Sequence, residues 1–515
     1  MEFIDNFIDS LDWGRVSDLL TYDSSSPMIF SSGLFFFAFL LFLPIYGLLR
    51  QNKFLRIVYV ALFSLFFYYK SSGLYVFLLL FAATSDFIIG LMMEKEPHKN
   101  RRRRYVIASM CINLGVLAYF KYFNFLGSLF FDALNTLGAA VIRPDWTVGE
   151  WNNWDIVLPA GISFYTFQTM SYIIDLYRGE IKPLRRWIDY VFYVSFFPQL
   201  VAGPIVRAKD FIPQINRKPS LSKAEYGEAL ALIISGLFKK AIISDYISLN
   251  FVDRIFDAPS LYTGLENLLG VYGYALQIYC DFSGYSDMAI GIALLLGFRF
   301  NINFDSPYQS ASITEFWRRW HISLSTWLRD YLYIPLGGNR KGKLRTYINL
   351  MITMLLGGLW HGAALRFILW GALHGLALAL HKLWSSLVPS STRNADELPK
   401  WRRWMGRLIT FHLVCFAWIF FRADSMEIAR DVIHQIYTNF HPEVFFQFVA
   451  GYKLVFVLMV VGYLLHFTSH RSERRFRLFF TRAKFSWQVA IILLLIVVII
   501  QMRSAEIQPF IYFQF

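Results

Sequence analysis

Apolar runs long enough to cross a bilayer constrain this chain more than any other feature of its sequence. A membrane-spanning helix needs roughly 20 consecutive, mostly apolar residues. Residues 29–49, 73–93 and 485–500 are such runs, and each contains at most one charged residue. The whole chain has 17% charged residues, whereas a soluble domain has about 25%. These features disfavour one large soluble core and predict an integral membrane protein.

The distribution of the apolar runs predicts an all-α fold, a polytopic transmembrane helical bundle of about 11–12 spans with re-entrant or interfacial helices. We expect residues 1–515 to form a single membrane domain. The candidate spans are 29–49, 54–70, 73–93, 104–121, 156–177, 225–247, 267–297, 345–361, 364–384, 405–421, 447–467 and 485–502.

Basic residues gather in short segments between the apolar runs. Residues 94–104 carry six basic and two acidic residues, whereas residues 1–28 carry one basic and six acidic residues. Cytoplasmic loops of membrane proteins are enriched in Lys and Arg. The basic residues behind the net charge of +14 therefore indicate the orientation of the chain in the membrane. We expect no nucleic-acid partner. The N-terminus is expected outside, with the first span kept as an anchor.

Two segments do not fit a simple alternation of spans. Residues 187–203 are apolar but lie between the basic segments 178–186 and 207–223, and they contain Pro198. We predict a re-entrant segment there, because broken helices at membrane depth occur only where protein or water satisfies the backbone. Residues 122–142 fit either a span or an interfacial helix.

His361 lies in the sequence GGLWHGA, at the end of the predicted span 345–361. Polar residues inside a membrane are costly and are therefore candidates for function. A neutral imidazole can take a proton from a hydroxyl group as a general base. A histidine that only joins two helices by hydrogen bonds fits the same position, so the pattern leaves both interpretations open.

Two further groups of polar residues lie near His361 in the sequence. His321 lies in the segment FWRRWHISLS, where Trp317 and Trp320 flank two arginines. Trp beside Arg is typical of a membrane interface, so this segment alone predicts an amphipathic anchor. The sequence DFSGYSD at 281–287 puts two carboxylates in an apolar run, and we expect them to face a cavity or a partner helix.

The sequence predicts no metal site. His374 and His381 share a helix face two turns apart, but no third ligand accompanies them. The three cysteines lie far apart and show no zinc-binding spacing.

Several motifs in one order resemble the membrane-bound O-acyltransferase superfamily, specifically its bacterial branch of alginate O-acetylation proteins. The matching segments are 119–125 (YFKYFNF), 158–168 (LPAGISFYTFQ), 197–205 (FPQLVAGPI), 281–287, 303–308 (NFDSPY), 317–325 and 358–362 (GLWHG). They cover roughly residues 119–375, and the ordered set is far more specific than any single motif.

The resemblance implies a helical fold with a central tunnel in the bacterial plasma membrane, with His361 as the principal catalytic residue and His321 as the second. It implies an acyl thioester donor, expected to be acetyl-CoA, that approaches from the cytoplasm, and no tightly bound cofactor. The acetyl group would pass outward, typically through a periplasmic SGNH-type acetyltransferase partner, to a polysaccharide such as alginate. Candidate substrate contacts are Trp317, Trp320, Ser323, Asp281, Ser283, Asp287 and Trp360.

Two other functions fit part of the pattern. The D-alanyl transfer protein of teichoic acid modification shares the two-histidine pattern and takes its acyl group from a carrier protein. A non-enzymatic transporter or flippase also has many spans and buried polar residues. That alternative lacks support from internal repeats and leaves the ordered motifs unexplained.

Overall fold

The computed structural model describes residues 13–23, 27–138, 158–388 and 399–502. These residues form helices and turns, and no β-strand occurs among them, so the all-α prediction is confirmed. The chain divides into two compact units. The first comprises Met1–Phe120, Thr147–Val201 and Val206–Pro219, and the second comprises Lys121–Trp146, Ala202–Ile205 and Ser220–Phe515. The expected single membrane domain stays a prediction.

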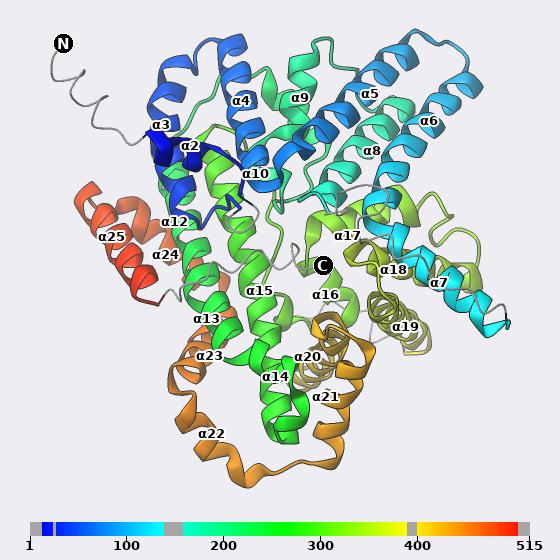
Figure 1. The fold of residues 1–515 in the computed structure, drawn as a ribbon, viewed down its shortest axis with the longest axis vertical. Coiled ribbons are helices and arrows are strands. Elements are labelled where there is room, and N and C mark those ends of the chain that lie inside the picture. The colour runs from blue at the N-terminus through cyan, green and yellow to red at the C-terminus, as the bar shows by residue number, and fades with distance from the viewer. Residues whose placement is uncertain (1–12, 24–26, 139–157, 389–398, 503–515) are drawn as a thin grey trace. The chain divides into compact units, whose positions relative to one another are not determined.

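The described residues of the first unit are mostly helical (Figure 1). Its helices are α2 (Trp13–Leu20), α3 (Gly33–Leu49), α4 (Lys53–Ser72), η1 (Gly73–Tyr75), α5 (Val76–Lys95), α6 (Lys99–Leu117), α8 (Ile162–Arg178), α9 (Trp187–Ser195), α10 (Phe197–Leu200) and α11 (Ala208–Ile215). The π-helix η2 (Ala118–Tyr122) leads from the first unit into the second.

Phe197, at the start of α10, is the centre of the first unit's aromatic core. Its ring is fully buried, and six phenylalanine rings surround it at centroid distances of 5.1–6.3 Å. These rings are Phe30, Phe35, Phe39, Phe42, Phe63 and Phe67. The Phe197 backbone N–H also donates to the Ser64 hydroxyl at 3.1 Å, so both ring and backbone fix α10 against α4.

The segment 187–203 is broken as the sequence predicts. Helix α9 ends at Ser195, Phe196 leaves the helical conformation (φ −52°, ψ 109°), and α10 follows with Pro198 in its first turn. Residues 189–206 are all buried, so protein surrounds the interrupted backbone. The passage of this segment into and out of a membrane stays a prediction. In the other ambiguous segment, α7 (Phe123–Thr136) is helical, and residues 139–142 lie outside the described part of the chain.

The second unit is built around the 32-residue helix α15, which packs along α12 (Figure 1). Besides α7, its helices are α12 (Lys223–Leu237), η3 (Phe238–Ser244), α13 (Asp245–Ile247), η4 (Ser248–Val252), α14 (Asp253–Asp257), η5 (Pro259–Leu261), α15 (Gly264–Leu295), η6 (Pro307–Gln309), α16 (Ile313–Arg319), α17 (Ile322–Leu328), η7 (Arg329–Tyr333), α18 (Lys343–His361), α19 (Leu365–Leu387), α20 (Lys400–Arg422), α21 (Met426–Thr438), η10 (Pro442–Val444), α22 (Phe445–Gly451), α23 (Lys453–His466), α24 (His470–Arg482) and α25 (Phe485–Met502).

The described residues contain fewer clear spans than the predicted 11–12. Four helical stretches are long and apolar enough to cross a membrane, and two bent helix pairs raise this number to six. The four are Lys53–Lys95, Lys99–Thr136, Leu365–Leu387 and Lys400–Arg422. α3 and α8 have only 17 residues each. The predicted spans 54–70 and 73–93 lie in one helical stretch of 43 residues, which is long enough for two crossings of roughly 20 residues each. The number of 11–12 spans stays a prediction.

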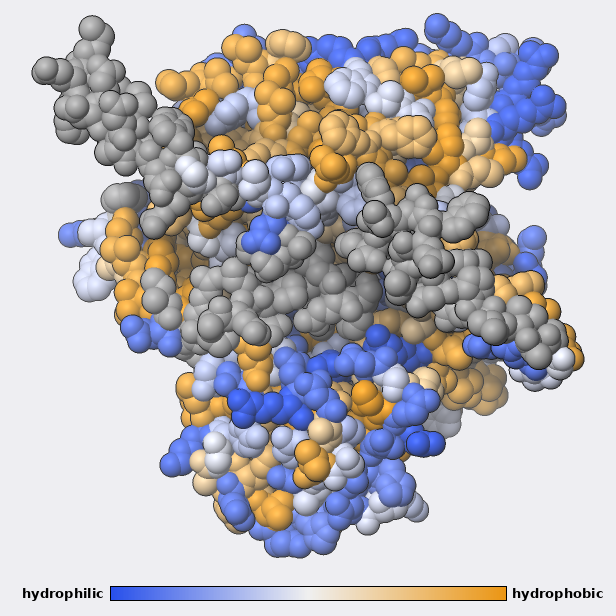
Figure 2. Space-filling model, in the orientation of Figure 1, coloured by the Kyte–Doolittle hydropathy of each residue, from blue (hydrophilic) through white to orange (hydrophobic). Residues whose placement is uncertain are grey.

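Large apolar side chains lie on the surface of the first unit, and Figure 2 shows them as a band over its helices. On α3, for example, Phe37 is 71% exposed and Leu48 is 83% exposed. Soluble monomers rarely expose continuous apolar patches of this kind. The surface therefore supports contact with lipid.

We expect Phe197→Ala to destabilise the protein by about 3–5 kcal/mol, because the substitution empties the centre of a buried aromatic cluster. The thermal unfolding temperature of the detergent-purified protein measures this effect. Phe37→Ala is the matched control, since the same truncation on an exposed ring removes few protein contacts. Equal unfolding temperatures for the two variants would contradict the assigned core.

Candidate active site

His361 is held by a close hairpin of α18 and α19 in the second unit. A Cβ atom on Gly358 would lie 3.2 Å from the backbone of Gly371 and would also meet the Phe367 carbonyl oxygen. A Cβ atom on Gly371 would meet the carbonyl oxygen of Met354. Small residues let helix backbones approach closely within a membrane, so the glycines of GGLWHG fix the end of α18 against α19.

The His361 imidazole is enclosed by aromatic rings. The residue is 2% exposed, at the last position of α18. The ring centroids of Trp360 and Trp370 each lie 5.0 Å from it, and Phe421 of α20 lies at 5.1 Å. His361 is therefore buried within the protein and is packed against three aromatic rings; its catalytic role stays a prediction.

His321 occupies a strained backbone position between two short helices. Its φ of 43° is left-handed, and Ser306 is the one other non-glycine residue with positive φ in the described chain. Such a conformation costs of order 1–3 kcal/mol and persists where neighbouring contacts impose it. Here the Ile322 N–H donates to the Asn303 carbonyl at 2.9 Å, and the Ser323 N–H donates to Asn303 Oδ1 at 3.1 Å.

Asn303 also sets the tautomer of His321. Its Nδ2 donates to the Ser286 hydroxyl at 3.1 Å, so its Oδ1 is the acceptor for Ser323 and lies 3.2 Å from His321 Nδ1. Nδ1 must therefore carry the proton, which leaves the lone pair on Nε2. Burial lowers the pKa of His321, which lies outside the candidate spans, to about 3. The ring is neutral at physiological pH.

Trp360 links the two histidines. Its ring centroid lies 6.2 Å from His321 and 5.0 Å from His361. The Phe282 ring centroid lies 4.5 Å from that of His321. The structure thus brings together three residues that the sequence singles out: His321, Trp360 and His361.

The predicted interfacial anchor at Trp317 and Trp320 is wrong. Trp317 is 9% exposed and Trp320 is 1% exposed, so neither indole is available to lipid headgroups. Trp317 Nε1 donates to His374 Nδ1 at 3.3 Å, and Trp320 packs on Trp418 at a centroid distance of 5.0 Å. The alternation of Trp and Arg is misleading here, because an interfacial anchor would expose both arginines. Only Arg318 is exposed, whereas Arg319 forms an ion pair with Glu315 at 2.9 Å.

The carboxylates of 281–287 contact lysines. Asp281 lies 2.6 Å from Lys240, and Asp287 lies 2.7 Å from Lys239, both in the π-helix η3. Ser283 is buried in the same helix, α15. The residues of α15 that reach the His321 loop are Phe282 and Ser286. The proposed contacts of Asp281, Ser283 and Asp287 with substrate stay predictions.

Sequence reasoning missed four residues that contact the histidines or the end of α18. Asn303 lies in a motif segment, but nothing in the sequence shows that its amide reaches His321. The Trp370 ring meets the His361 ring edge-on, and Lys121 and Tyr122 bond the carbonyls at the end of α18. Each of these contacts joins different structural elements, so periodicity and local spacing within one element carry no sign of them.

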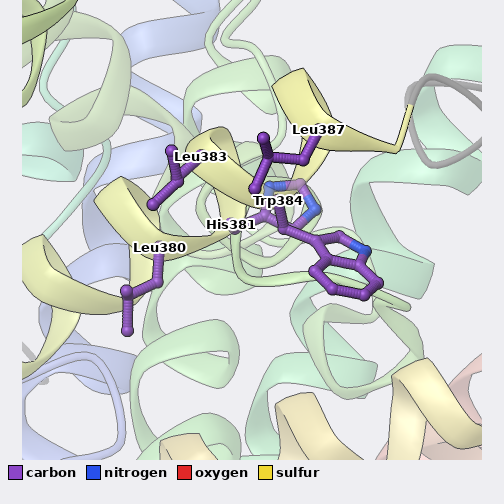
Figure 3. A pocket seen from close by; sticks show the side chains of 5 residues that line it. All are labelled: Leu380, His381, Leu383, Trp384 and Leu387. Atoms are coloured by element: carbon purple, nitrogen blue, oxygen red, sulfur yellow. The ribbon is translucent and has the colours of Figure 1, made fainter.

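The pair His374 and His381 is divided between two environments. His374 is buried between Trp317 and Trp370. His381 lies 2.9 Å from the Thr314 hydroxyl and lines a shallow pocket near the end of α19 with Leu380, Leu383, Trp384 and Leu387 (Figure 3). Apart from His381, the side chains that line this pocket are apolar. Among the described residues, no three metal-ligand side chains converge.

The arrangement suits proton transfer in a site that excludes water. Two buried histidines lie near Trp360, and aromatic rings pack around both of them. A water-poor site strengthens electrostatic interactions and suppresses hydrolysis of a reactive acyl group. The fold and the site together define a membrane protein with a buried two-histidine centre.

The sequence pattern of the membrane-bound O-acyltransferase family matches residues 186–422, a range that includes both histidines. The chain is 42% identical over 406 residues to the "Probable alginate O-acetylase AlgI" of Pseudomonas aeruginosa, which is 78% of this chain and 73% of that protein. It is also 36% identical over 440 residues to the peptidoglycan O-acetyltransferase of Helicobacter pylori, 79% of each chain. The identity to the teichoic acid D-alanyltransferase of Bacillus subtilis is 30% over 279 residues, 51% of this chain and 68% of that protein.

The chain therefore belongs to the membrane-bound O-acyltransferase family and is an acyltransferase.

We expect Asn303→Ala to lower acyl transfer roughly 10–100-fold, the usual cost of losing the partner that orients a functional histidine. The substitution frees the His321 ring and leaves the Ser323 N–H without its acceptor. Acyl transfer per folded protein in membranes measures the effect. Asn267→Ala is the matched control, because Asn267 is an equally buried amide whose bonds go to Pro259, Tyr262 and Thr263. Similar losses in both variants would contradict a specific role for Asn303.

Proposed function

We propose that this protein moves an acetyl group from a cytoplasmic acyl thioester across the membrane for O-acetylation of a cell-surface polysaccharide such as alginate. The observation that carries the proposal is the buried pair His321 and His361 near Trp360. The chain is also similar, over more than three quarters of its length, to a probable alginate O-acetylase and to a peptidoglycan O-acetyltransferase. The match to the D-alanyltransferase is weaker in identity and covers less of the chain, which favours acetyl transfer.

In the proposed reaction His361 acts as the general base. It takes the proton of the acceptor hydroxyl while the hydroxyl oxygen attacks the thioester carbonyl carbon. A C–O bond forms, the C–S bond breaks, and the proton passes from His361 to the departing thiolate. We assign the neutral His321 imidazole a second polar contact with the reacting groups. Trp317, Trp320, Ser323 and Trp360 stay candidate substrate contacts.

We infer that the donor is acetyl-CoA, which would bind as a substrate and not as a tightly held cofactor. The protein would lie in the bacterial plasma membrane with several passes, so that the donor stays in the cytoplasm and only the acyl end reaches the site. A periplasmic SGNH-type acetyltransferase would receive the acetyl group and modify the polysaccharide. The apolar walls of the site support passage of a short acyl group without hydrolysis.

His361→Ala should lower polysaccharide acetylation by at least about 10²–10⁴-fold, the usual contribution of a general base. The alkali-labile acetate content of the surface polysaccharide, normalised to folded protein in the membrane, measures this loss. His361→Gln should be similarly inactive, because an amide hydrogen-bonds but does not act as a base.

His412→Ala is the matched control, since His412 is exposed on α20 and bonds Tyr272. It should acetylate at the wild-type level. If His361→Gln also acetylates at that level, His361 is a structural histidine and the proposed mechanism is wrong.

A further inference from the structure

Lys121 and Tyr122 lie against the C-terminal end of α18, at the residues that carry His361. Lys121 Nζ donates to the carbonyl oxygen of Trp360 at 2.6 Å and to that of His361 at 3.2 Å. The Tyr122 hydroxyl donates to the carbonyl oxygen of Leu359 at 2.8 Å. Three consecutive carbonyls, including that of His361 itself, are therefore bonded by two neighbouring side chains.

These contacts satisfy groups that a helix cannot satisfy by itself. The last four carbonyl groups of an α-helix have no N–H partner within the helix. After His361 the backbone becomes extended, with φ −163° and ψ 153° at Gly362, so α18 does not continue. A positive charge near a helix C-terminus is also favourable, because the helix dipole is negative there.

The local backbone explains how two adjacent residues serve one helix end. Lys121 and Tyr122 belong to the π-helix η2, whose wider turn changes the direction of successive side chains, and such insertions occur frequently at functional sites. The Lys121 ammonium group also lies 5.9 Å from the centroid of the Trp360 ring. Both residues thus contact the backbone at the end of α18, and Lys121 also contacts the Trp360 ring, which lies near both histidines.

We propose that Lys121 and Tyr122 are positioning residues that fix the end of α18 and thereby the His361 imidazole. The inference rests on the catalytic role of His361 given under the proposed function. A displacement of about 1 Å at a reacting group can cost roughly 10²-fold in rate. Loss of these contacts should therefore lower the rate of the chemical step, whereas binding of the donor should change little.

The test compares variants of the full chain in membranes that contain equal amounts of folded protein. Labelled acetyl-CoA is added as the donor probe, and initial rates of acetyl incorporation into polysaccharide are measured against its concentration. Lys121→Met keeps the length of the side chain and removes the donor group. We expect kcat to fall roughly 10–100-fold with KM within about threefold of wild type. Tyr122→Phe, which removes one hydroxyl, should lower kcat roughly 2–10-fold.

Lys121→Arg restores a cationic donor and should recover part of the lost kcat. Lys70→Met is the matched control, because Lys70 is a buried lysine that also donates to a backbone carbonyl, that of Thr21. The Lys70→Met substitution also removes a buried amino group, but in the first unit, and it should leave kcat at the wild-type value. We expect the alkali-labile acetate content of the surface polysaccharide in whole cells to rank the variants in the same order. That measurement needs no assumption about the donor.

The outcomes separate this inference from the proposed function. Wild-type kcat in Lys121→Met, or equal losses in Lys121→Met and Lys70→Met, overturns the positioning role. A failure of Lys121→Arg to exceed Lys121→Met also overturns it. If His361→Ala, measured in the same series, retains wild-type activity, then the proposed function itself fails.

Discussion

At the crossing of α18 and α19 the two backbones approach so closely that a Cβ atom on Gly358 would lie 3.2 Å from Gly371. Lipid tails are as apolar as side chains, so helix association in a membrane depends on this kind of close packing. The hairpin sets the position of His361 at the end of α18. It also sets Trp370 and His374, which lie one turn apart on α19. The aromatic enclosure of the site follows from this one contact.

Several polar groups of the site form hydrogen bonds with side chains from other segments of the chain. Asn303 bonds the His321 loop and connects it to Ser286 of α15. Lys121 and Tyr122 bond the end of α18. Hydrogen bonds between buried groups favour one defined geometry. The residues that carry His321 and His361 are therefore each held in place by several such bonds.

The sequence predicts the features that depend on local pattern. The bounds of α18 and α19 follow from the lengths of their apolar runs, and His361 stands out because an ionisable residue there is costly. Local sequence pattern gives wrong predictions where a side chain contacts residues from another part of the chain. The carboxylates of 281–287 resemble a site until Lys239 and Lys240 are found beside them. Trp317 and Trp320 resemble lipid anchors because composition alone does not show which face of a short helix is covered by protein. The role of Asn303 has no local sign at all.

The most direct measurement is a cryo-EM structure of the full chain in lipid with a non-hydrolysable acetyl thioester analogue. The account predicts the acetyl carbonyl within about 3–3.5 Å of a site that an acceptor oxygen can occupy beside the His361 imidazole, between Trp360 and Trp370. It would be contradicted if the acetyl group bound elsewhere, for example in the shallow pocket of Leu380 and Trp384, while aromatic rings still closed off His361.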